Sequence, residues 1–159
     1  IIPVAEQVGA LTDKTVVVVP TRSMPEALAA LVVYDPSADA ADTAGEMAEA
    51  ADSVVTGEVT QAVRDSKSPV GPVAEGDWIG LVRGDGIASV ASSVDAASMA
   101  LLDRIVGDDA ELVTVITGRD AIDSTTEAIR AWLRDHRGDV AVEVHRGGQP
   151  LYPYLFGVE

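Results

Sequence analysis

The stretch Glu111-Leu112-Val113-Thr114-Val115-Ile116 is a run of mostly apolar, β-favouring residues and is the clearest fold signal in the chain. A continuous apolar run of this length is typical of a strand buried on both faces, as in a parallel sheet. Residues 124–133 then follow a helical pattern, and residues 140–144 return to a strand pattern. A strand, a helix and a second strand in this order predict an α/β fold.

Earlier parts of the chain extend the same pattern. Thr15-Val16-Val17-Val18-Val19 predicts another buried strand, and Ser23-Met24-Pro25-Glu26 after it has the capping-box pattern that begins a helix. Residues 77–83 and 87–90 flank Gly84-Asp85-Gly86, which predicts a β-hairpin around a tight turn. We therefore predict a layered α/β fold with a mixed, mostly parallel sheet that includes a β-hairpin.

The remaining segments have weaker signals. Thr43-Ala44-Gly45-Glu46 and Ser124-Thr125-Thr126-Glu127 have the capping-box pattern and predict two further helices that begin there. Residues 54–63 are expected to be extended, and residues 66–76 form the longest expected loop because they contain two prolines and two glycines. Residues 151–158 are apolar and aromatic, which favours an ordered final strand.

Length and charge limit the classes of function. The chain has 159 residues, which suits a single α/β domain over residues 1–159. It has 26 acidic and 11 basic residues, and a net charge of -15 argues against binding to nucleic acid or to anionic membranes. No base occurs between Arg22 and Arg64, whereas eight acids do, so acidity is concentrated around the predicted helix over residues 43–54.

Composition excludes other classes of site. The absence of cysteine excludes disulfides, thiolate catalysis and cysteine-zinc centres, and two histidines, His136 and His145, make an all-histidine metal site implausible. No apolar run reaches the ~20 residues of a membrane helix, so no membrane insertion is expected. No secretory signal is visible, so we expect a cytoplasmic protein, and the opening Ile1-Ile2-Pro3 suggests a fragment.

Two turns are candidate anion-binding sites. Thr21-Arg22-Ser23 lies between the predicted strand 15–19 and a capped helix, and free N–H groups, hydroxyls and a guanidinium there could hold a carboxylate or a phosphate. Thr117-Gly118-Arg119 follows the strand 111–116 with a similar composition, and neighbouring strands would place both turns in one crevice. The alternatives are that Ser23 only caps its helix and that residues 117–119 form an ordinary polar loop.

His145 is the remaining candidate site residue. It follows a predicted strand and could act as a general base or donate a hydrogen bond to a ligand, or it could be a partly buried histidine that holds the turn. No nucleophile elbow and no Walker loop occur in the sequence. We therefore assign no catalytic and no metal-ligating residue.

Several stretches together resemble one known family, the bacterial dihydroxyacetone-kinase-like proteins, in their C-terminal region. The best-understood members of that family are the ATP-binding subunits of fatty-acid kinase. The stretches that carry the resemblance are residues 17–31, 55–65, 76–80, 111–118 and 143–154, of which Gly147-Gly148-Gln149-Pro150-Leu151-Tyr152 is the most specific.

The resemblance implies a fold akin to that of the lipid-binding partner proteins of these kinases. It also implies that the chain is a C-terminal fragment of a longer protein, without the kinase domain and without its own first strand. ATP and magnesium belong to that kinase domain, so no cofactor is expected in this chain. A fatty-acid-binding protein is the implied partner, and a homodimer is a second expected assembly.

Three functional hypotheses follow. The leading one is a non-catalytic C-terminal domain of a fatty-acid-kinase or dihydroxyacetone-kinase-like protein that acts in partner docking or assembly. In that case the full-length protein is a kinase, whereas this chain alone is not an enzyme. The alternatives are a small-molecule domain that binds an acyl carboxylate or a phosphate, and an independent phosphotransferase or hydrolase.

Overall fold

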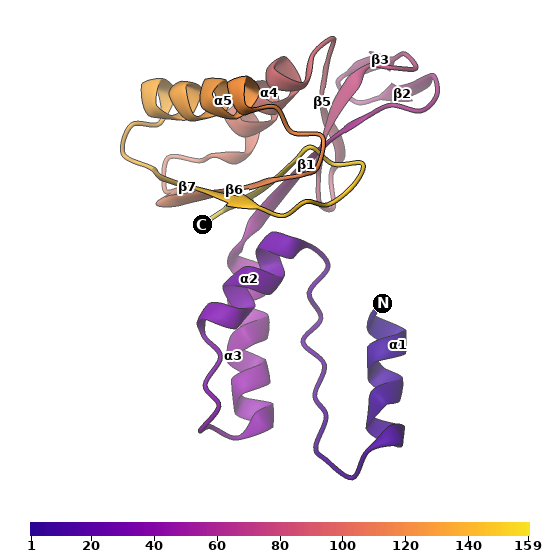
Figure 1. The fold of residues 1–159 in the computed structure, drawn as a ribbon, viewed down its shortest axis with the longest axis vertical. Helices are drawn as coiled ribbons and strands as arrows, with labels where there is room; N and C mark the ends of the chain where they lie inside the picture. The colour runs from indigo at the N-terminus through magenta and orange to yellow at the C-terminus, as the bar shows by residue number, and fades with distance from the viewer. The chain divides into compact units, whose positions relative to one another are not determined.

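A computed structural model describes residues 1–159 (Figure 1). The chain divides into two compact units, and each is described by itself. Unit 1 is Ile1–Val54 and unit 2 is Val55–Glu159. No helix in either unit is long and apolar enough to cross a membrane.

Unit 1 consists of helices joined by extended chain. Helices α2 and α3 pack on each other, whereas α1 continues into the short 3-10 helix η1 (Figure 1). The elements are α1 (Ile2–Glu6), η1 (Gln7–Leu11), α2 (Met24–Val32) and α3 (Ala40–Ser53).

The capping box predicted at the start of α2 is confirmed. The Ser23 Oγ accepts a hydrogen bond from the Glu26 N–H at 3.3 Å, and the Glu26 carboxylate accepts one from the Arg22 N–H at 2.7 Å. Side chains thus satisfy one N–H group of the first turn, that of Glu26, and the Arg22 N–H just before the N-cap. Glu26 is 1% exposed, so this capping carboxylate is part of the packed interior.

The predicted start of α3 at Thr43 is wrong, because the helix begins one turn earlier. Asp39 is the N-cap, and its Oδ1 accepts a hydrogen bond from the Ala41 N–H at 2.8 Å. The Thr43 hydroxyl instead donates to the Asp35 carbonyl oxygen at 3.2 Å. An aspartate carboxylate is as good a helix cap as a hydroxyl, so the earlier cap decides the boundary.

The buried strand predicted at Thr15–Val19 is also wrong. Residues 12–22 form no helix and pair with no strand, and they run between η1 and α2 as an open segment (Figure 1). Val16 is 38% exposed and Val17 is 44% exposed. The β-branched run favours an extended backbone, but a strand also needs a neighbour to accept and donate its ladder hydrogen bonds.

Unit 2 is built on a six-stranded sheet in the order β5-β4-β1-β8-β6-β7. The extended segment predicted at residues 54–63 and the final strand predicted at 151–158 are confirmed as β1 and β8. The strands are β1 (Val55–Gln61), β4 (Trp78–Val82), β5 (Gly86–Ala91), β6 (Leu112–Thr117), β7 (Ala141–Arg146) and β8 (Tyr154–Val158).

The sheet is mixed but mostly antiparallel, which corrects the prediction of a mostly parallel sheet. Only β6 and β7 are parallel, and α5 (Asp123–His136) connects them. β8 lies between β1 and β6 and is antiparallel to both. Consecutive residues of β6 and β8 are buried, so these two strands have the mostly apolar sequence that is usual in parallel sheets.

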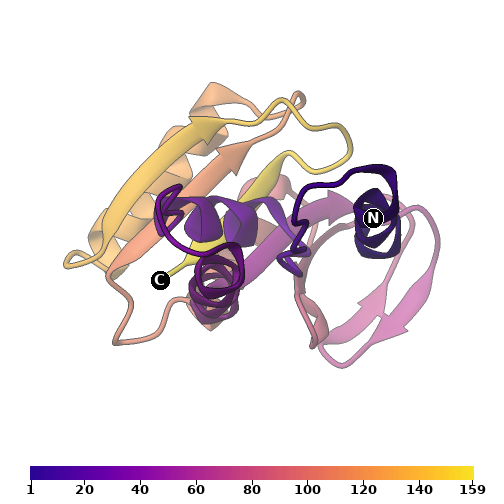
Figure 2. The ribbon, with the colours of Figure 1, turned by 90° about the horizontal axis from the view of Figure 1, so that it is seen from below.

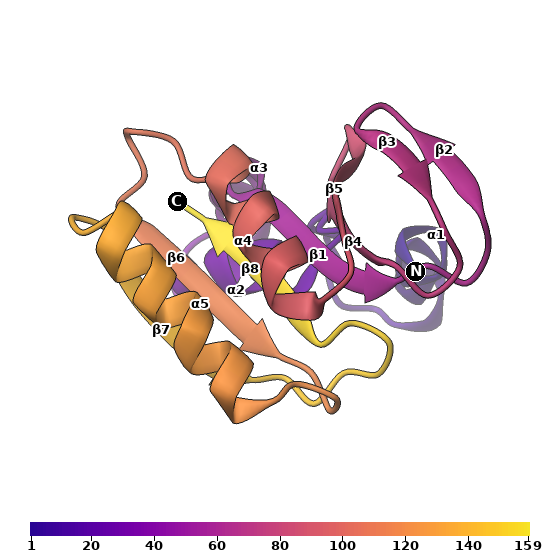
Figure 3. The ribbon, with the colours of Figure 1, turned by 90° about the horizontal axis from the view of Figure 1, so that it is seen from above.

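The hairpin around Gly84-Asp85-Gly86 is confirmed as β4 and β5. Gly84 and Gly86 have φ values of 89° and 81°, which side chains with a Cβ rarely adopt. Residues 66–76, predicted as a loop, contain a second hairpin of β2 (Ser66–Ser68) and β3 (Gly71–Val73). This small two-stranded sheet lies apart from the six-stranded one, near β4 and β5 (Figures 2 and 3).

Two helices cover one face of the six-stranded sheet (Figures 1 and 3). Helix α4 (Val94–Ile105) packs on β1, β4 and β5 and contacts α5. Ser93 is the N-cap of α4, and its side chain accepts a hydrogen bond from the Ala96 N–H. Helix α5 begins at Asp123 after Ile122, without a side-chain cap and ahead of the predicted Ser124. Their shared core includes Val59, Leu101, Leu102, Val113, Val115, Ile129, Leu133, Tyr154 and Phe156, all 0% exposed.

We predict that Gly80→Ala destabilises unit 2 by about 1–3 kcal/mol, because overpacking a filled core forces its neighbours to shift. A Cβ at Gly80 would lie 2.3 Å from the Ser89 Oγ and 2.9 Å from the Leu101 Cβ. Chemical denaturation followed by circular dichroism measures the effect.

Gly45→Ala is the matched control. A Cβ at Gly45, inside α3, meets nothing within 4 Å. Alanine favours the helix there by about 0.5–1 kcal/mol, so this variant should be stabilised. An unchanged stability of Gly80→Ala would contradict the tight contact between β4 and α4.

Candidate functional site

The turn Thr21-Arg22-Ser23 lies in unit 1 at the start of α2. Its three residues line a pocket of about 580 Å³ together with mainly apolar residues, among them Ile2, Pro3 and Met24. The Ser23 hydroxyl and the Arg22 N–H are both used in the capping box of α2. The Arg22 side chain and the Thr21 hydroxyl therefore remain the polar groups of this turn that a ligand could reach.

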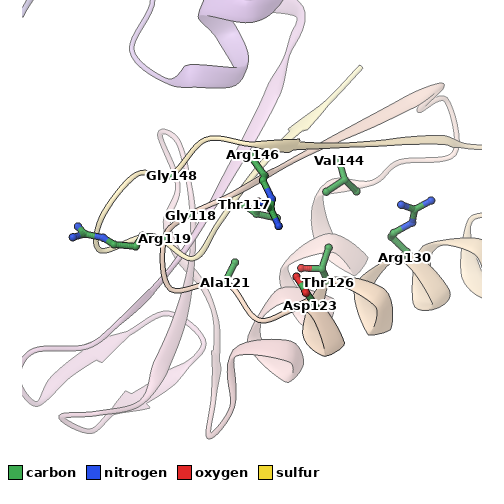
Figure 4. A pocket seen from close by; sticks show the side chains of 10 residues that line it. All are labelled: Thr117, Gly118, Arg119, Ala121, Asp123, Thr126, Arg130, Val144, Arg146 and Gly148. Atoms are coloured by element: carbon green, nitrogen blue, oxygen red, sulfur yellow. The ribbon is translucent and has the colours of Figure 1, made fainter.

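The turn Thr117-Gly118-Arg119 lies in unit 2 and lines a different pocket, of about 570 Å³ (Figure 4). This pocket lies where the parallel strands β6 and β7 end and α5 begins. Such a position is the usual ligand site of α/β sheets. The pocket is lined by Thr117, Gly118, Arg119, Ala121, Asp123, Thr126, Arg130, Val144, Arg146 and Gly148.

The loop over residues 147–153 fixes the shape of this pocket. The Gly118 N–H donates to the Pro153 carbonyl at 2.8 Å, and the Arg119 N–H donates to the Gln149 carbonyl at 3.0 Å. A Cβ at Gly118 would lie 2.2 Å from the Tyr152 carbonyl oxygen, so only glycine allows this approach. The turn after β6 is thus held by the backbone of the loop that leads into β8.

A buried hydroxyl pair anchors α5 to the sheet below the pocket. The Tyr154 hydroxyl lies 2.9 Å from the Thr126 Oγ1 and donates to the Ile122 carbonyl at 3.1 Å. Tyr154 is 0% exposed. Burial raises the pKa of its phenol above the ordinary value, although the hydrogen bonds with Thr126 and Ile122 act in the opposite direction.

His145 lies on β7 but does not line the pocket. Its Nε2 lies 3.1 Å from the Glu143 Oε2, and both side chains are more than half exposed. Its carbonyl oxygen accepts a hydrogen bond from the Thr117 Oγ1 at 3.2 Å. The backbone of His145 therefore links β7 to the pocket turn, while its ring forms a surface ion pair when protonated.

The structure brings together only part of the predicted set. Thr117, Gly118 and Arg119 share one pocket, whereas Thr21, Arg22 and Ser23 belong to the other unit. Pocket residues that the sequence analysis missed are Thr126, Arg130 and Arg146. Thr126 and Arg130 are four residues apart on a helix, which places them on one face, but their proximity to the end of β7 depends on strand pairing. No group of three or more histidine and acidic residues could hold a metal ion.

A family model of the C-terminal domain of FakA-like fatty acid kinase proteins matches residues 1–159. The chain belongs to this family. The match confirms the family resemblance that the sequence motifs predict.

Proteins similar to this chain occur in Staphylococcus aureus. The chain is 37% identical over 159 residues to an uncharacterized protein of strain MRSA252 and 36% identical to one of strain USA300. These matches cover 100% of this chain and 29% of each relative. The FakA-like C-terminal domain thus spans less than a third of the length of these relatives.

We predict that the stability of the domain depends on Tyr154 at alkaline pH. The phenol has a higher pKa in the folded than in the unfolded chain, where the ordinary value is 10.0. The contribution of the phenol to the free energy of unfolding is therefore fully present below the pKa of the unfolded chain. It is lost as the pH rises through the pKa of the folded chain. Chemical denaturation between about pH 8 and 11 should show this loss.

Tyr154→Phe should remove that alkaline dependence and lower the free energy of unfolding at neutral pH by about 1–2 kcal/mol, because hydrogen bonds are lost. Tyr34→Phe is the control, since Tyr34 is 55% exposed. Equal pH profiles for the wild type and Tyr154→Phe would contradict the role of the buried phenol.

Proposed function

We propose that this chain is a non-catalytic domain of a fatty-acid-kinase-type protein and that it docks a partner protein. The kinase chemistry, with ATP and magnesium, would belong to another part of such a protein. The partner that we propose is the fatty-acid-binding protein of the kinase system. The observation that carries the proposal is the exposed apolar surface of unit 1.

Apolar exposure is concentrated in unit 1. Of the 17 large hydrophobic side chains that are exposed, 12 lie within Ile1–Val54. Helix α2 contributes Leu28 at 43%, Leu31 at 60% and Val32 at 85% exposure. Single exposed hydrophobic residues are ordinary, but a set of this size on one short unit is typical of an interaction surface.

A groove in unit 1 lies beside these residues. It has a volume of about 480 Å³ and is lined by residues of the open segment, including Val17 and Val19, and by residues of α2 and α3, including Leu31 and Met47. The segment Thr15–Val19 has an extended backbone without a ladder partner. An unpaired extended segment beside an apolar groove favours the addition of a strand from another chain.

Helix α3 adds an acidic surface to unit 1. Asp42, Glu46, Glu49 and Asp52 are exposed and follow each other at intervals of four, three and three residues. This spacing places them on one side of the helix. We infer that the partner carries basic residues around an apolar centre, because opposite charges speed association and reject wrong partners.

We predict that the double variant Glu46→Lys/Glu49→Lys weakens binding of the fatty-acid-binding protein at least about tenfold at low salt, since charge reversal creates repulsion in place of attraction. Isothermal titration calorimetry of chain 1–159 with the partner measures this. Raising the salt from about 0.05 to 0.5 M should weaken wild-type binding, because salt screens surface charges.

The matched control is Asp108→Lys/Asp109→Lys, which makes the same change in net charge on exposed residues of unit 2. The affinity of this control variant for the fatty-acid-binding protein should stay near that of the wild type. Equal losses in the two double variants would contradict docking through α3. No binding by the wild type would contradict the proposed function as a whole.

A second variant pair tests the apolar part of the surface. Val32 is 85% exposed in unit 1, and Val63 is 86% exposed in unit 2. Val32→Ser should weaken partner binding about fivefold or more, because it removes apolar area that the complex buries, whereas Val63→Ser should not. Sedimentation velocity of the same variants tests whether a homodimer uses this surface instead, and a dimer sensitive to Val32→Ser would overturn the assignment to a separate partner.

A further inference from the structure

The pocket of unit 2 concentrates positive charge in a strongly acidic chain. Three of its ten lining residues are arginines, Arg119, Arg130 and Arg146, and one is an acid, Asp123. The chain as a whole has a net charge of -15. The residues that line this pocket thus have a net formal charge of opposite sign to that of the whole chain.

None of these three guanidinium groups is neutralised by a salt bridge. Two other arginines of the same region are paired, Arg134 with Asp135 at 3.3 Å and Arg137 with Asp103 at 3.1 Å. Figure 4 shows Arg146 extending from the end of β7 toward the helix, while Arg119 extends away from the other side chains. Arg130 and Arg146 therefore come from two different walls of the pocket, α5 and β7.

Backbone donors lie beside these arginines. Thr117 and Thr126 also line the pocket, but the Thr117 hydroxyl donates to the His145 carbonyl, and the Thr126 hydroxyl bonds to the Ile122 carbonyl and the Tyr154 hydroxyl. Helix α5 is 14 residues long, and its N-cap is Ile122, whose side chain cannot accept hydrogen bonds from the N–H groups of the first turn. Guanidinium groups and the free N–H groups of a helix N-terminus are donors that bind phosphate in proteins.

The walls of the pocket are fixed without a ligand. The N–H groups of Gly147 and Gly148 both donate to the Thr117 carbonyl, at 2.9 and 3.1 Å. The Gln149 amide group donates to the Tyr152 carbonyl at 3.0 Å, and the Tyr154 hydroxyl holds α5 in place. A preformed pocket loses less entropy on binding than a flexible loop does.

We propose that this pocket binds the phosphate group of a small phosphorylated molecule, through Arg130 and Arg146. A phosphomonoester carries a charge of about -1.5 to -2 at neutral pH, more than a carboxylate, and this suits a site with an excess of two positive charges. The volume of about 570 Å³ exceeds what a free phosphate needs. Ala121 and Val144 supply apolar contacts for the organic part of the ligand. This inference is independent of the docking role of unit 1.

The test compares two probes that differ only in their acidic group, phenyl phosphate and benzoate, on chain 1–159. Isothermal titration calorimetry gives the affinities, and amide chemical shifts in NMR spectra locate the site. Phenyl phosphate should bind at least about tenfold more tightly than benzoate, because its charge is larger and it accepts more hydrogen bonds. The affected amides should be those of residues 117–126 and 144–148.

Arg130→Gln and Arg146→Gln should each weaken phenyl phosphate binding at least about tenfold, since each removes a charge-assisted hydrogen bond. Arg134→Gln is the matched control, because Arg134 lies on the same helix outside the pocket and should have no effect. Asp123→Asn should tighten binding about fivefold, since it removes the carboxylate that repels the ligand. Misfolding cannot produce such a gain.

Benzoate that binds as tightly as phenyl phosphate would overturn the assignment of the ligand class. Phenyl phosphate binding that is insensitive to both pocket arginines, or that Arg134→Gln weakens equally, would overturn the site. Absence of saturable binding by either probe would overturn the proposal entirely.

Discussion

The insertion of β8 between β1 and β6 is the constraint on which unit 2 depends. All five residues of β8, Tyr154–Val158, are buried, and their backbones pair with a strand on each side. A polar backbone can lie so deep only when both of its edges are hydrogen-bonded. Without β8, the β5-β4-β1 half and the β6-β7 half of the sheet share no ladder. The cores under α4 and α5 become one because Tyr154 and Phe156 lie between them.

The pocket in unit 2 depends on the same strand. The loop that leads into β8 accepts the hydrogen bonds of the Gly118 and Arg119 N–H groups, and Tyr154 at the start of β8 holds the first turn of α5. The β6–β7 pairing places Arg146 at this pocket, and the bonds of β8 and its loop hold the turn after β6 and the start of α5 in place. The elements that carry the pocket arginines are therefore supported by β8, which is the most buried strand of the unit.

The sequence predicts those elements that depend only on residues close together in the chain. The hairpin at Gly84–Gly86, the Ser23 cap and the buried strand 111–116 each follow from a few neighbouring residues, and each is confirmed. Whether neighbouring strands are parallel or antiparallel could not be predicted, because a buried central strand has the same apolar sequence in both kinds of sheet.

Contacts between residues far apart in the chain explain the other differences between the prediction and the structure. The run Thr15–Val19 has the sequence of a strand but no neighbour in the structure. Thr117, Gly118 and Arg119 could be found from one turn, whereas Arg130 and Arg146 come from separate elements, and only the β6–β7 register shows that they belong to the same pocket. The polar residues of a single turn can therefore be predicted from the sequence, whereas the set of residues from separate elements that line one pocket cannot.

The central place of β8 has a consequence for the order in which unit 2 folds. Its partner β1 is made about a hundred residues earlier, so the sheet cannot close until β8 has been synthesised. Until then β1 and β6 each have an unpaired strand edge, which is the kind of surface on which aggregates nucleate.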